Sequence, residues 1–367
     1  MRIWISGGGT GGHVYPALTV LDASDAETEV TWLGRADSLE AALVAERGGL
    51  RFLPIAAGPL VGQGPLGRMR GVLRLGRGSL AAWRAAGAER PAAVLVTGGY
   101  VSVPVSVAAW LRRIPLLVYL PDLRPGRAVQ LIARMATRIA ITHAAAAERL
   151  PAGKSIVTGY PVRSALRAAD PIRSRARLGL APDRPILLVF GGSQGAQRLN
   201  RALVAAAPRL LARCQIVHVC GPSQLSEVSA ARAALGDALG AGYRLDGYLH
   251  GADMAAALAS ADLVLCRAGA ATLGELPALG LPAILVPLPI SGGHQWPNAA
   301  LLESAGAALT VPDGELDGPR LADEVMGLLD APERLAAMRV AARSLDHPDA
   351  ARAIWQLLIG LTEGGRA

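Results

Sequence analysis

The feature that most constrains the fold is a pattern that occurs twice: an apolar run, a glycine-rich turn, and then a stretch of helical character. It reads IWISGGGTGGHVYPA at residues 3–17 and ILLVFGGSQGAQRLN at residues 186–200. Glycines let a backbone approach a phosphate closely, and the free amides at the start of the following helix supply positive potential. The pattern therefore predicts two Rossmann-like domains, each with an anion-binding loop after its first strand.

Further apolar runs have the leucine-rich and β-branched character of buried parallel strands. We predict strands at residues 2–6, 29–33, 93–96, 116–119, 138–142, 186–190, 216–219, 244–245, 263–266 and 283–286. A chain of 367 residues exceeds the usual size of one core, and the proline-containing segment 159–185 has no predicted strand, so we expect the linker there. The expected fold class is α/β, with two Rossmann-like domains (residues 1–160 and 161–347) facing across a cleft. A helix within residues 348–367 is expected to pack back on the first domain.

The excess positive charge lies entirely in the first half of the chain. Residues 1–160 contain 18 basic and 10 acidic residues, whereas residues 161–367 contain 19 of each. An excess of one sign indicates an anionic partner, either nucleic acid or an acidic membrane, although a solvated surface in a basic proteome would give the same composition. The basic stretch has few aromatic residues for base stacking, which argues against nucleic acid.

Residues 68–84, RMRGVLRLGRGSLAAWR, mix apolar and arginine residues at roughly helical spacing. A surface helix of this kind can bind an anionic bilayer, and a core-facing helix with solvated arginines would share the pattern. We recognise no signal peptide and no apolar stretch long enough to span a membrane. We therefore expect a peripheral protein at the cytoplasmic face of the cell membrane, with contacts from Met69, Leu73, Arg74, Arg77, Leu80, Trp83 and Trp110.

Several residues near the predicted loops have two readings. His13 ends the first loop, where an imidazole can accept a proton from an acceptor hydroxyl or simply pack. Ser193 of the second loop can bind a phosphate or cap the helix. Arg163 can neutralise a diphosphate or lie solvated at the surface. Glu275, after the small-residue segment 267–274, can accept from ribose hydroxyls or be an ordinary acid near a helix start.

Residues 291–299, SGGHQWPNA, place an imidazole and two side-chain amides on one turn. Such groups suit the neutral hydroxyls of a sugar better than they suit charges. The three cysteines lie in apolar runs without metal-ligand spacing. Their setting indicates reduced core thiols, and we predict no metal site.

Taken together, the motifs resemble the MurG family of peptidoglycan N-acetylglucosaminyltransferases. They are GGGTGGHVYPA, TGGYVSVP, GYPVR, GGSQGAQRLN, RAGAATLGELPALGLPAILVP and HQWPNA, in the family's order. The resemblance implies the GT-B fold and an inverting transfer with no cofactor and no obligatory metal. The implied donor is UDP-N-acetylglucosamine (UDP-GlcNAc). The implied acceptor is lipid I, a muramyl-pentapeptide on undecaprenyl diphosphate, and the product is lipid II.

The same resemblance implies a role for each matched residue. The acceptor diphosphate would lie against Gly9, Thr10, Gly11, Gly12 and Tyr100, with His13 as the base. The donor would be held by Arg163 and Ser193 at the diphosphate, Leu249 at the uracil edge, Ala270 and Thr272 along the nucleotide, Glu275 at the ribose, and His294, Gln295 and Asn298 at the sugar.

One departure from the family concerns the acceptor. Where the family has His-Glu-Gln-Asn, this chain has Tyr-Leu-Pro-Asp at residues 119–122. Asp122 could accept from a sugar hydroxyl or serve as the base instead of His13. A MurG-like enzyme with a different lipid or glycoside acceptor is therefore an alternative. Two further alternatives are a UDP-GlcNAc 2-epimerase and a non-catalytic module that binds a UDP-sugar or a polyprenyl diphosphate.

Overall fold

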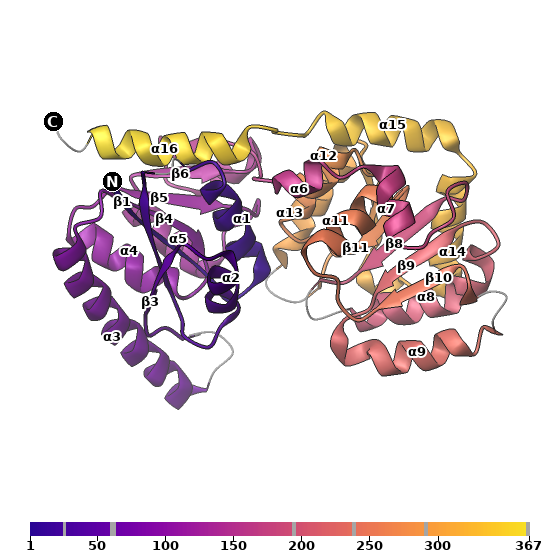
Figure 1. Cartoon of the computed structure of the whole chain (residues 1–367), viewed down its shortest axis with the longest axis horizontal. Coiled ribbons are helices and arrows are strands. Elements are labelled where there is room, and N and C mark those ends of the chain that lie inside the picture. The colour runs from indigo at the N-terminus through magenta and orange to yellow at the C-terminus, as the bar shows by residue number, and fades with distance from the viewer. Residues whose placement is uncertain (25–26, 59–63, 193–195, 237–239, 290–292, 365–367) are drawn as a thin grey trace. The chain divides into compact units, whose positions relative to one another are not determined.

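The computed structural model of the chain divides into two compact units, Met1–Pro161 with His347–Ala367, and Val162–Asp346. It describes all residues except 25–26, 59–63, 193–195, 237–239, 290–292 and 365–367. Each unit is built on one parallel sheet with helices packed on it (Figure 1). The predicted α/β class with two Rossmann-like domains is confirmed.

The first unit contains a seven-stranded sheet. Its strands are β1 (Arg2–Gly7), β2 (Glu29–Gly34), β3 (Arg51–Pro54), β4 (Ala93–Gly98), β5 (Leu116–Leu120), β6 (Arg138–Ile141) and β7 (Ser155–Val157), in the spatial order β3-β2-β1-β4-β5-β6-β7. Its helices are α1 (Gly11–Leu21), α2 (Leu39–Arg47), α3 (Pro65–Glu89), α4 (Ser102–Leu111), α5 (Arg127–Met135), the 3-10 helix η1 (Ala144–Arg149) and α16 (Ala350–Gly364). Every residue of β4 and β5 is buried, as expected of central parallel strands.

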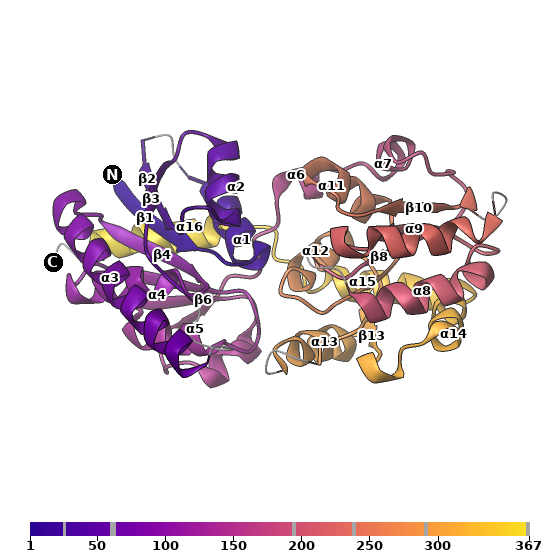
Figure 2. The same ribbon diagram turned by 90° about the horizontal axis from the view of Figure 1, so that it is seen from below.

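Helix α16 joins the first unit although the whole second unit precedes it in the chain. It packs against α1, β4 and β5, and Figures 1 and 2 both show it along the sheet beside α1. Ile354, Trp355 and Leu358 are buried there. The core of the first unit is therefore completed by residues far from it in sequence.

The second unit contains a six-stranded sheet. Its strands are β8 (Ile186–Phe190), β9 (Gln215–Val219), β10 (Tyr243–Asp246), β11 (Leu263–Cys266), β12 (Ala283–Leu285) and β13 (Ala308–Thr310), in the order β10-β9-β8-β11-β12-β13. Its helices are α6 (Ser164–Arg167), α7 (Pro171–Arg177), α8 (Gln197–Leu210), α9 (Leu225–Ala233), α11 (Gly251–Ser260), α12 (Thr272–Leu279), α13 (Gln295–Ser304), α14 (Gly318–Leu329) and α15 (Pro332–Arg343), with 3-10 turns η2 (Pro222–Gln224) and η4 (Asp313–Glu315).

In each sheet the strand order reverses direction between two neighbouring strands. The reversal falls between β1 and β4 in the first unit and between β8 and β11 in the second. Open parallel sheets bind ligands beyond the carboxyl ends of their strands at such a switch point. The first glycine loop follows β1, and Gly191 and Gly192 of the second loop follow β8. Both predicted loops therefore begin where this rule places a ligand.

None of the described helices combines the length and the apolar character that a membrane crossing would need.

Candidate active site

In the first unit, the glycine loop after β1 is interlocked with the loop after β4. The Gly8 amide donates to the Gly98 carbonyl at 3.4 Å, and a side chain at Gly99 would collide with the Gly8 backbone. The Ser102 hydroxyl lies 2.7 Å from the Gly98 carbonyl and 3.1 Å from the Ser6 carbonyl. The two loops at the switch point are therefore hydrogen-bonded to each other and packed so closely that residue 99 must be a glycine.

The residues predicted to hold the acceptor diphosphate border these loops. Gly9 has a φ of +87° and open space around its Cα. Thr10 precedes α1, and its hydroxyl makes no capping bond. Gly11 and Gly12 form the first turn of α1, and Tyr100 follows the β4 loop. The helix start and the glycine backbone suit an anion, but contact of these residues with a diphosphate stays a prediction.

His13 lies in the first turn of α1 and reaches β4. Its Nδ1 atom is 2.7 Å from the Thr97 carbonyl oxygen. Because a carbonyl can only accept, Nδ1 of the neutral ring carries the proton, and Nε2 is the basic nitrogen. The Thr97 hydroxyl in turn donates to the His13 carbonyl at 2.6 Å. Residue 97 thus fixes both the position and the tautomer of the histidine.

Two glycines give His13 the room for this arrangement. A Cβ at Gly98, whose φ is +112°, would lie 2.7 Å from Cε1 of the His13 ring, and a Cβ at Gly7 would collide with the Thr97 hydroxyl. A side chain at either position would displace the pair. The two glycines are therefore needed for the histidine as well as for the loop.

Asp122, the second candidate base, acts on His13 electrostatically. Burial lowers the pKa of His13 below its ordinary value, and the negative charge of Asp122 opposes that effect. The imidazole is therefore mostly neutral near pH 7, and a carboxylate favours the imidazolium that forms once a proton is taken up. The structure brings the two candidate bases into one electrostatic group.

The departure at residues 119–122 has a structural explanation at its first position. Tyr119 is fully buried, and its hydroxyl lies 3.0 Å from the Thr142 hydroxyl. The Thr142 hydroxyl also lies 3.0 Å from the Pro121 carbonyl. Burial raises the pKa of Tyr119 far above its ordinary value. Tyr119 is therefore a core residue that secures the segment carrying Asp122.

Glu40 of α2, which the sequence analysis did not single out, lies behind the first loop. It is 1% exposed. Its carboxylate accepts from the Gly9 amide and from the Arg35 amide, both at 3.3 Å. The side chain also occupies the space beside Gly8 and Gly34. One buried carboxylate therefore joins the glycine loop to the end of β2.

In the second unit, two predicted donor ligands contact each other. Nη2 of Arg163, which precedes α6, lies 3.3 Å from Oε1 of Glu275 in the first turn of α12. Burial raises the pKa of Glu275, and the Arg163 charge opposes the rise. The pair joins the segment after the first unit to the loop that follows β11. Their assigned contacts with diphosphate and ribose stay predictions.

The other predicted donor residues lie around the loops that follow β10, β11 and β12. Thr272 donates to the Gly269 carbonyl at 2.6 Å, and Ala270 and Leu249 are buried. Gln295 accepts from the Leu288 amide at 2.9 Å. These contacts fix the shape of the loops, and the assigned contacts with the nucleotide and the sugar are untested.

Two residues around α13 and one in the second glycine loop complete the predicted set. Asn298 is fully buried and donates to the Ala268 carbonyl at 3.1 Å, so it ties α13 to the β11 loop. His294 has a buried Nδ1 atom with no hydrogen-bond partner among the described residues, and its assigned contact with the sugar stays a prediction. Ser193 lies outside the described residues.

Within the described part of the chain, no group of three or more His, Cys, Asp or Glu side chains could hold a metal ion.

The chain matches two adjacent domain profiles of one enzyme family. Residues 3–141 match the glycosyltransferase family 28 N-terminal domain, and residues 186–354 match the family 28 C-terminal domain. A protein of Roseiflexus sp. (strain RS-1) is 41% identical over 98% of this chain and 94% of its own length. A protein of Desulforudis audaxviator is 39% identical over the full length of both. Both relatives are named UDP-N-acetylglucosamine–N-acetylmuramyl-(pentapeptide) pyrophosphoryl-undecaprenol N-acetylglucosamine transferase.

Solved structures agree at the level of the fold. The crystal structure of Acinetobacter baumannii MurG has a TM-score of 0.74 at 27% identity, covering 98% of this chain and 99% of that one. A putative UDP-N-acetylglucosamine 2-epimerase from Listeria monocytogenes has a TM-score of 0.71 at 18% identity, covering 96% of this chain and 94% of that one. The second likeness shows a shared fold alone.

Proposed function

The chain belongs to the MurG family of glycosyltransferases, and on that premise we propose that it transfers N-acetylglucosamine from UDP-GlcNAc to a muramyl-pentapeptide on undecaprenyl diphosphate. The first unit binds the acceptor and the second binds the UDP-sugar. The observation that carries the proposal is His13, a histidine of fixed tautomer beside a glycine loop at a switch point. A general base beside an anion-binding loop is what an acceptor with a diphosphate and a reactive hydroxyl requires.

The proposed reaction is a single displacement. Nε2 of His13 accepts the proton of the acceptor hydroxyl while that oxygen bonds to the anomeric carbon and the bond from that carbon to UDP breaks. The configuration at the anomeric carbon inverts. Arg163 and the backbone amides after β8 stabilise the negative charge of the departing UDP, with no cofactor and no metal.

We assign the base to His13 and a supporting role to Asp122. The hydrogen bond to Thr97 leaves Nε2 as the lone-pair nitrogen, and burial keeps the ring neutral near pH 7. The Asp122 charge stabilises the imidazolium once the proton has moved. In this assignment Asp122 stabilises the charged form of His13 and does not itself accept the proton.

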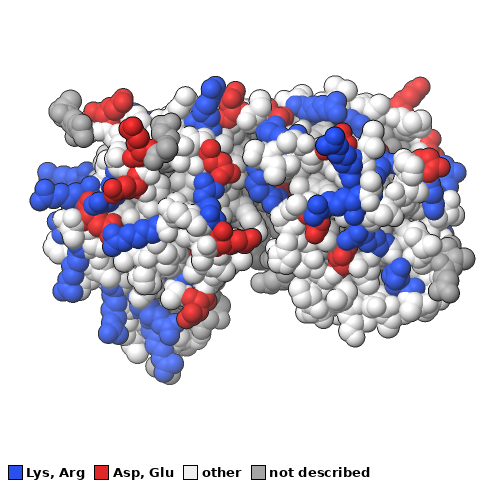
Figure 3. All heavy atoms as spheres, in the orientation of Figure 1, with Lys and Arg blue, Asp and Glu red and all other residues white. Residues whose placement is uncertain are grey.

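We also propose that the first unit docks on the anionic cytoplasmic face of the cell membrane. Large apolar side chains of α3 are exposed, including Leu73 at 61% and Met69 at 56%, and Trp110 at the end of α4 is exposed at 56%. The Arg112 guanidinium stacks on Trp83 at 4.0 Å, and Figure 3 shows further basic side chains along α3. Each basic residue near an anionic leaflet contributes about 1 kcal/mol.

The decisive test is a transfer assay with radiolabelled UDP-GlcNAc and a panel of acceptors. We expect label to pass to a muramyl-pentapeptide diphosphate lipid and not to diacylglycerol. Transfer to another lipid or glycoside alone would indicate a different acceptor. Release of N-acetylmannosamine and UDP without an acceptor would indicate an epimerase, and UDP-sugar binding without turnover would indicate a binding module.

Docking is measured separately by sedimentation with phosphatidylglycerol vesicles. We expect the wild-type chain to bind these vesicles more weakly as the salt concentration rises. We expect Leu73→Ser to bind them more weakly than the wild-type chain does. Equal sedimentation with neutral vesicles would contradict the electrostatic part of the proposal.

A further inference from the structure

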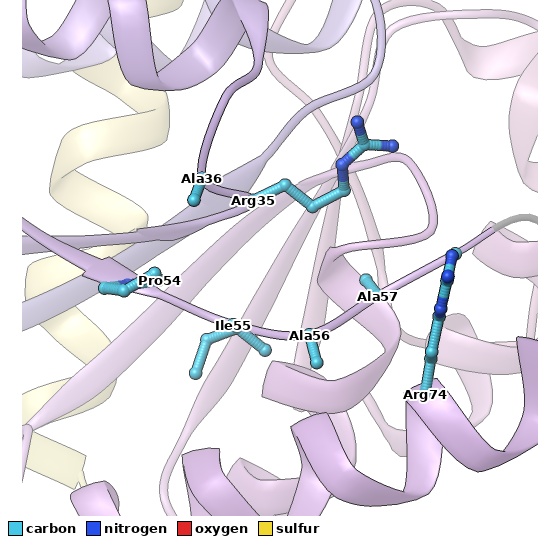
Figure 4. Close-up of a pocket in the computed structure, with 8 residues that line it drawn as sticks. Arg35, Ala36, Pro54, Ile55, Ala56, Ala57 and Arg74 are labelled. Atoms are coloured by element: carbon cyan, nitrogen blue, oxygen red, sulfur yellow. The ribbon is translucent and has the colours of Figure 1, made fainter.

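A pocket of about 440 Å³ opens at the carboxyl edge of the first sheet, away from the switch point. Its lining consists of Arg35 and Ala36 after β2, Pro54 at the end of β3, residues 55–58 after β3, and Arg74 of α3. Figure 4 shows Arg35 and Arg74 arising from different elements, with the segment from Pro54 to Ala57 running between them. No residue discussed so far as a ligand of donor or diphosphate lines this pocket.

The two arginines give the pocket its chemical character. Among the described residues that line the pocket they are the only charged ones, since the rest are alanine, proline, isoleucine and glycine. Neither arginine forms an ion pair with any residue in the described ranges. Two guanidinium groups above an apolar floor match a carboxylate carried by a small apolar residue, because guanidinium and carboxylate form charge-assisted hydrogen bonds.

Close packing positions Arg74 at the pocket. A Cβ at Gly78, one turn further along α3, would collide with the Ala56 carbonyl, and a Cβ at Gly58 would lie 3.4 Å from Cδ of Arg74. Helix α3 is therefore held against the segment after β3. Arg74, which the sequence analysis assigned to the membrane contacts, lines the pocket beside that segment.

The pocket is connected to the proposed acceptor loop. The Glu40 carboxylate accepts from the amides of both Gly9 and Arg35. Strands β1, β2 and β3 are consecutive neighbours in the sheet, and neighbouring strands are about 4.8 Å apart, so the pocket lies roughly 10 Å from the loop along the sheet edge. An extended peptide of five residues spans up to about 17 Å. A pentapeptide that begins near the loop can therefore reach the pocket.

We propose that the Arg35–Arg74 pocket binds the terminal carboxylate of the acceptor's pentapeptide. The proposal rests on the proposed function, because that function supplies the peptide. The diphosphate is assigned to the glycine loop, and the terminal carboxylate of the peptide is a further anionic group of the acceptor.

The test uses three soluble short-chain acceptors: one with a free peptide carboxylate, one with a C-terminal carboxamide, and one without the peptide. For the wild-type chain we expect amidation to raise the acceptor KM by on the order of 10-fold, the usual effect of losing a charged hydrogen bond. Arg35→Ala and Arg74→Ala should raise the KM for the carboxylate acceptor alike. Their kcat, their KM for UDP-GlcNAc and their KM for the carboxamide acceptor should stay at the wild-type values.

Arg134→Ala on α5 is the matched control, since Arg134 is also exposed and lies outside the pocket. The proposal is overturned if the two pocket variants lose affinity equally for the carboxamide acceptor. It is also overturned if they are impaired only on phosphatidylglycerol vesicles, which would assign the pocket to a lipid headgroup. Wild-type transfer to the acceptor that carries the peptide with a free carboxylate tests the proposed function separately, whichever way the pocket result falls.

Discussion

At the scale of single residues, the contact between His13 and Thr97 determines which nitrogen can take a proton. The Thr97 carbonyl accepts from Nδ1, so Nε2 is basic. We predict that His13→Ala lowers kcat by roughly 10²-fold or more, the usual contribution of a general base. The KM for UDP-GlcNAc should change little, because that ligand is assigned to the other unit. Steady-state kinetics check this, and full turnover would remove His13 from the mechanism.

The Thr97 hydroxyl provides a second, subtler test. Thr97→Val keeps the shape and the backbone carbonyl but removes the donor to the His13 carbonyl. Since a hydrogen bond of this kind contributes about 1 kcal/mol, we expect roughly a 5-fold loss of kcat. Thr97→Ser should restore most of it. The ¹⁵N chemical shifts of His13 report its tautomer directly, and an unchanged kcat in the valine variant would show that the hydroxyl does not position the base.

Residues whose type is itself informative can be predicted from the sequence, whereas residues that act through their contacts in the fold cannot. The five glycines within residues 7–12 and the adjacent His13 predict an anion-binding loop from residue type alone. Glu40 carries no such signal, and Thr97 appears only as the first residue of the motif TGGYVSVP, because the roles of both depend on β1, β2 and β4 ending side by side. Arg74 was assigned from helical spacing, which does not reveal that Gly78 presses α3 against Ala56.

At the scale of elements, ten strands were predicted close to their observed positions and three were missed. The missed strands, β3, β7 and β13, are all sheet edges. Their residues are mostly half-buried or exposed, so they lack the continuous apolar run that identifies a central parallel strand. Arg51 and Ser155 can open such strands because an edge has a neighbour on one side only.

A buried hydrogen-bonded group at β9 makes the stability of the second unit depend on pH. His218 is fully buried, with Nδ1 2.8 Å from the Tyr243 hydroxyl and Nε2 2.9 Å from Asn200 Oδ1. Burial lowers the pKa of His218 to about 3. The unfolded chain takes up a proton near pH 6.5, whereas the folded chain does not until the pH is far lower. The contribution of buried, neutral His218 to the stability of the second unit is therefore complete above pH 6.5 and declines as the pH falls towards 3.

We predict that between pH 6 and pH 4 this histidine lowers the free energy of unfolding by about 1.4 kcal/mol per pH unit. Denaturant unfolding at several pH values measures the slope. His218→Gln keeps a hydrogen-bonding side chain without the titration, so the difference between the two proteins isolates residue 218. Identical slopes for both proteins would contradict the prediction.

At the scale of the whole molecule, α16 links the end of the chain to the stability of the first unit. Removing residues 350–367 would expose the surfaces that Ile354, Trp355 and Leu358 cover. Each such side chain contributes about 1.5–3 kcal/mol by burial, so we expect the first unit to lose much of its stability. Turnover should disappear. The Kd for UDP, measured by calorimetry, should stay within about 2-fold of the wild-type value, because UDP is assigned to the second unit; a 2-fold change is under 0.5 kcal/mol. Loss of UDP binding would show that the second unit also depends on α16.

The same helix has a consequence for the order in which the protein matures. Because residues 347–367 belong to the first unit and follow all of the second, a ribosome releases the complete second unit before the first can close its core. The sheet of the first unit is synthesised first, but the face that α16 covers stays exposed while the second unit is synthesised and folds. Completion of the core of the first unit therefore depends on synthesis of α16, so a chain interrupted before residue 350 would lack the helix that packs on α1, β4 and β5.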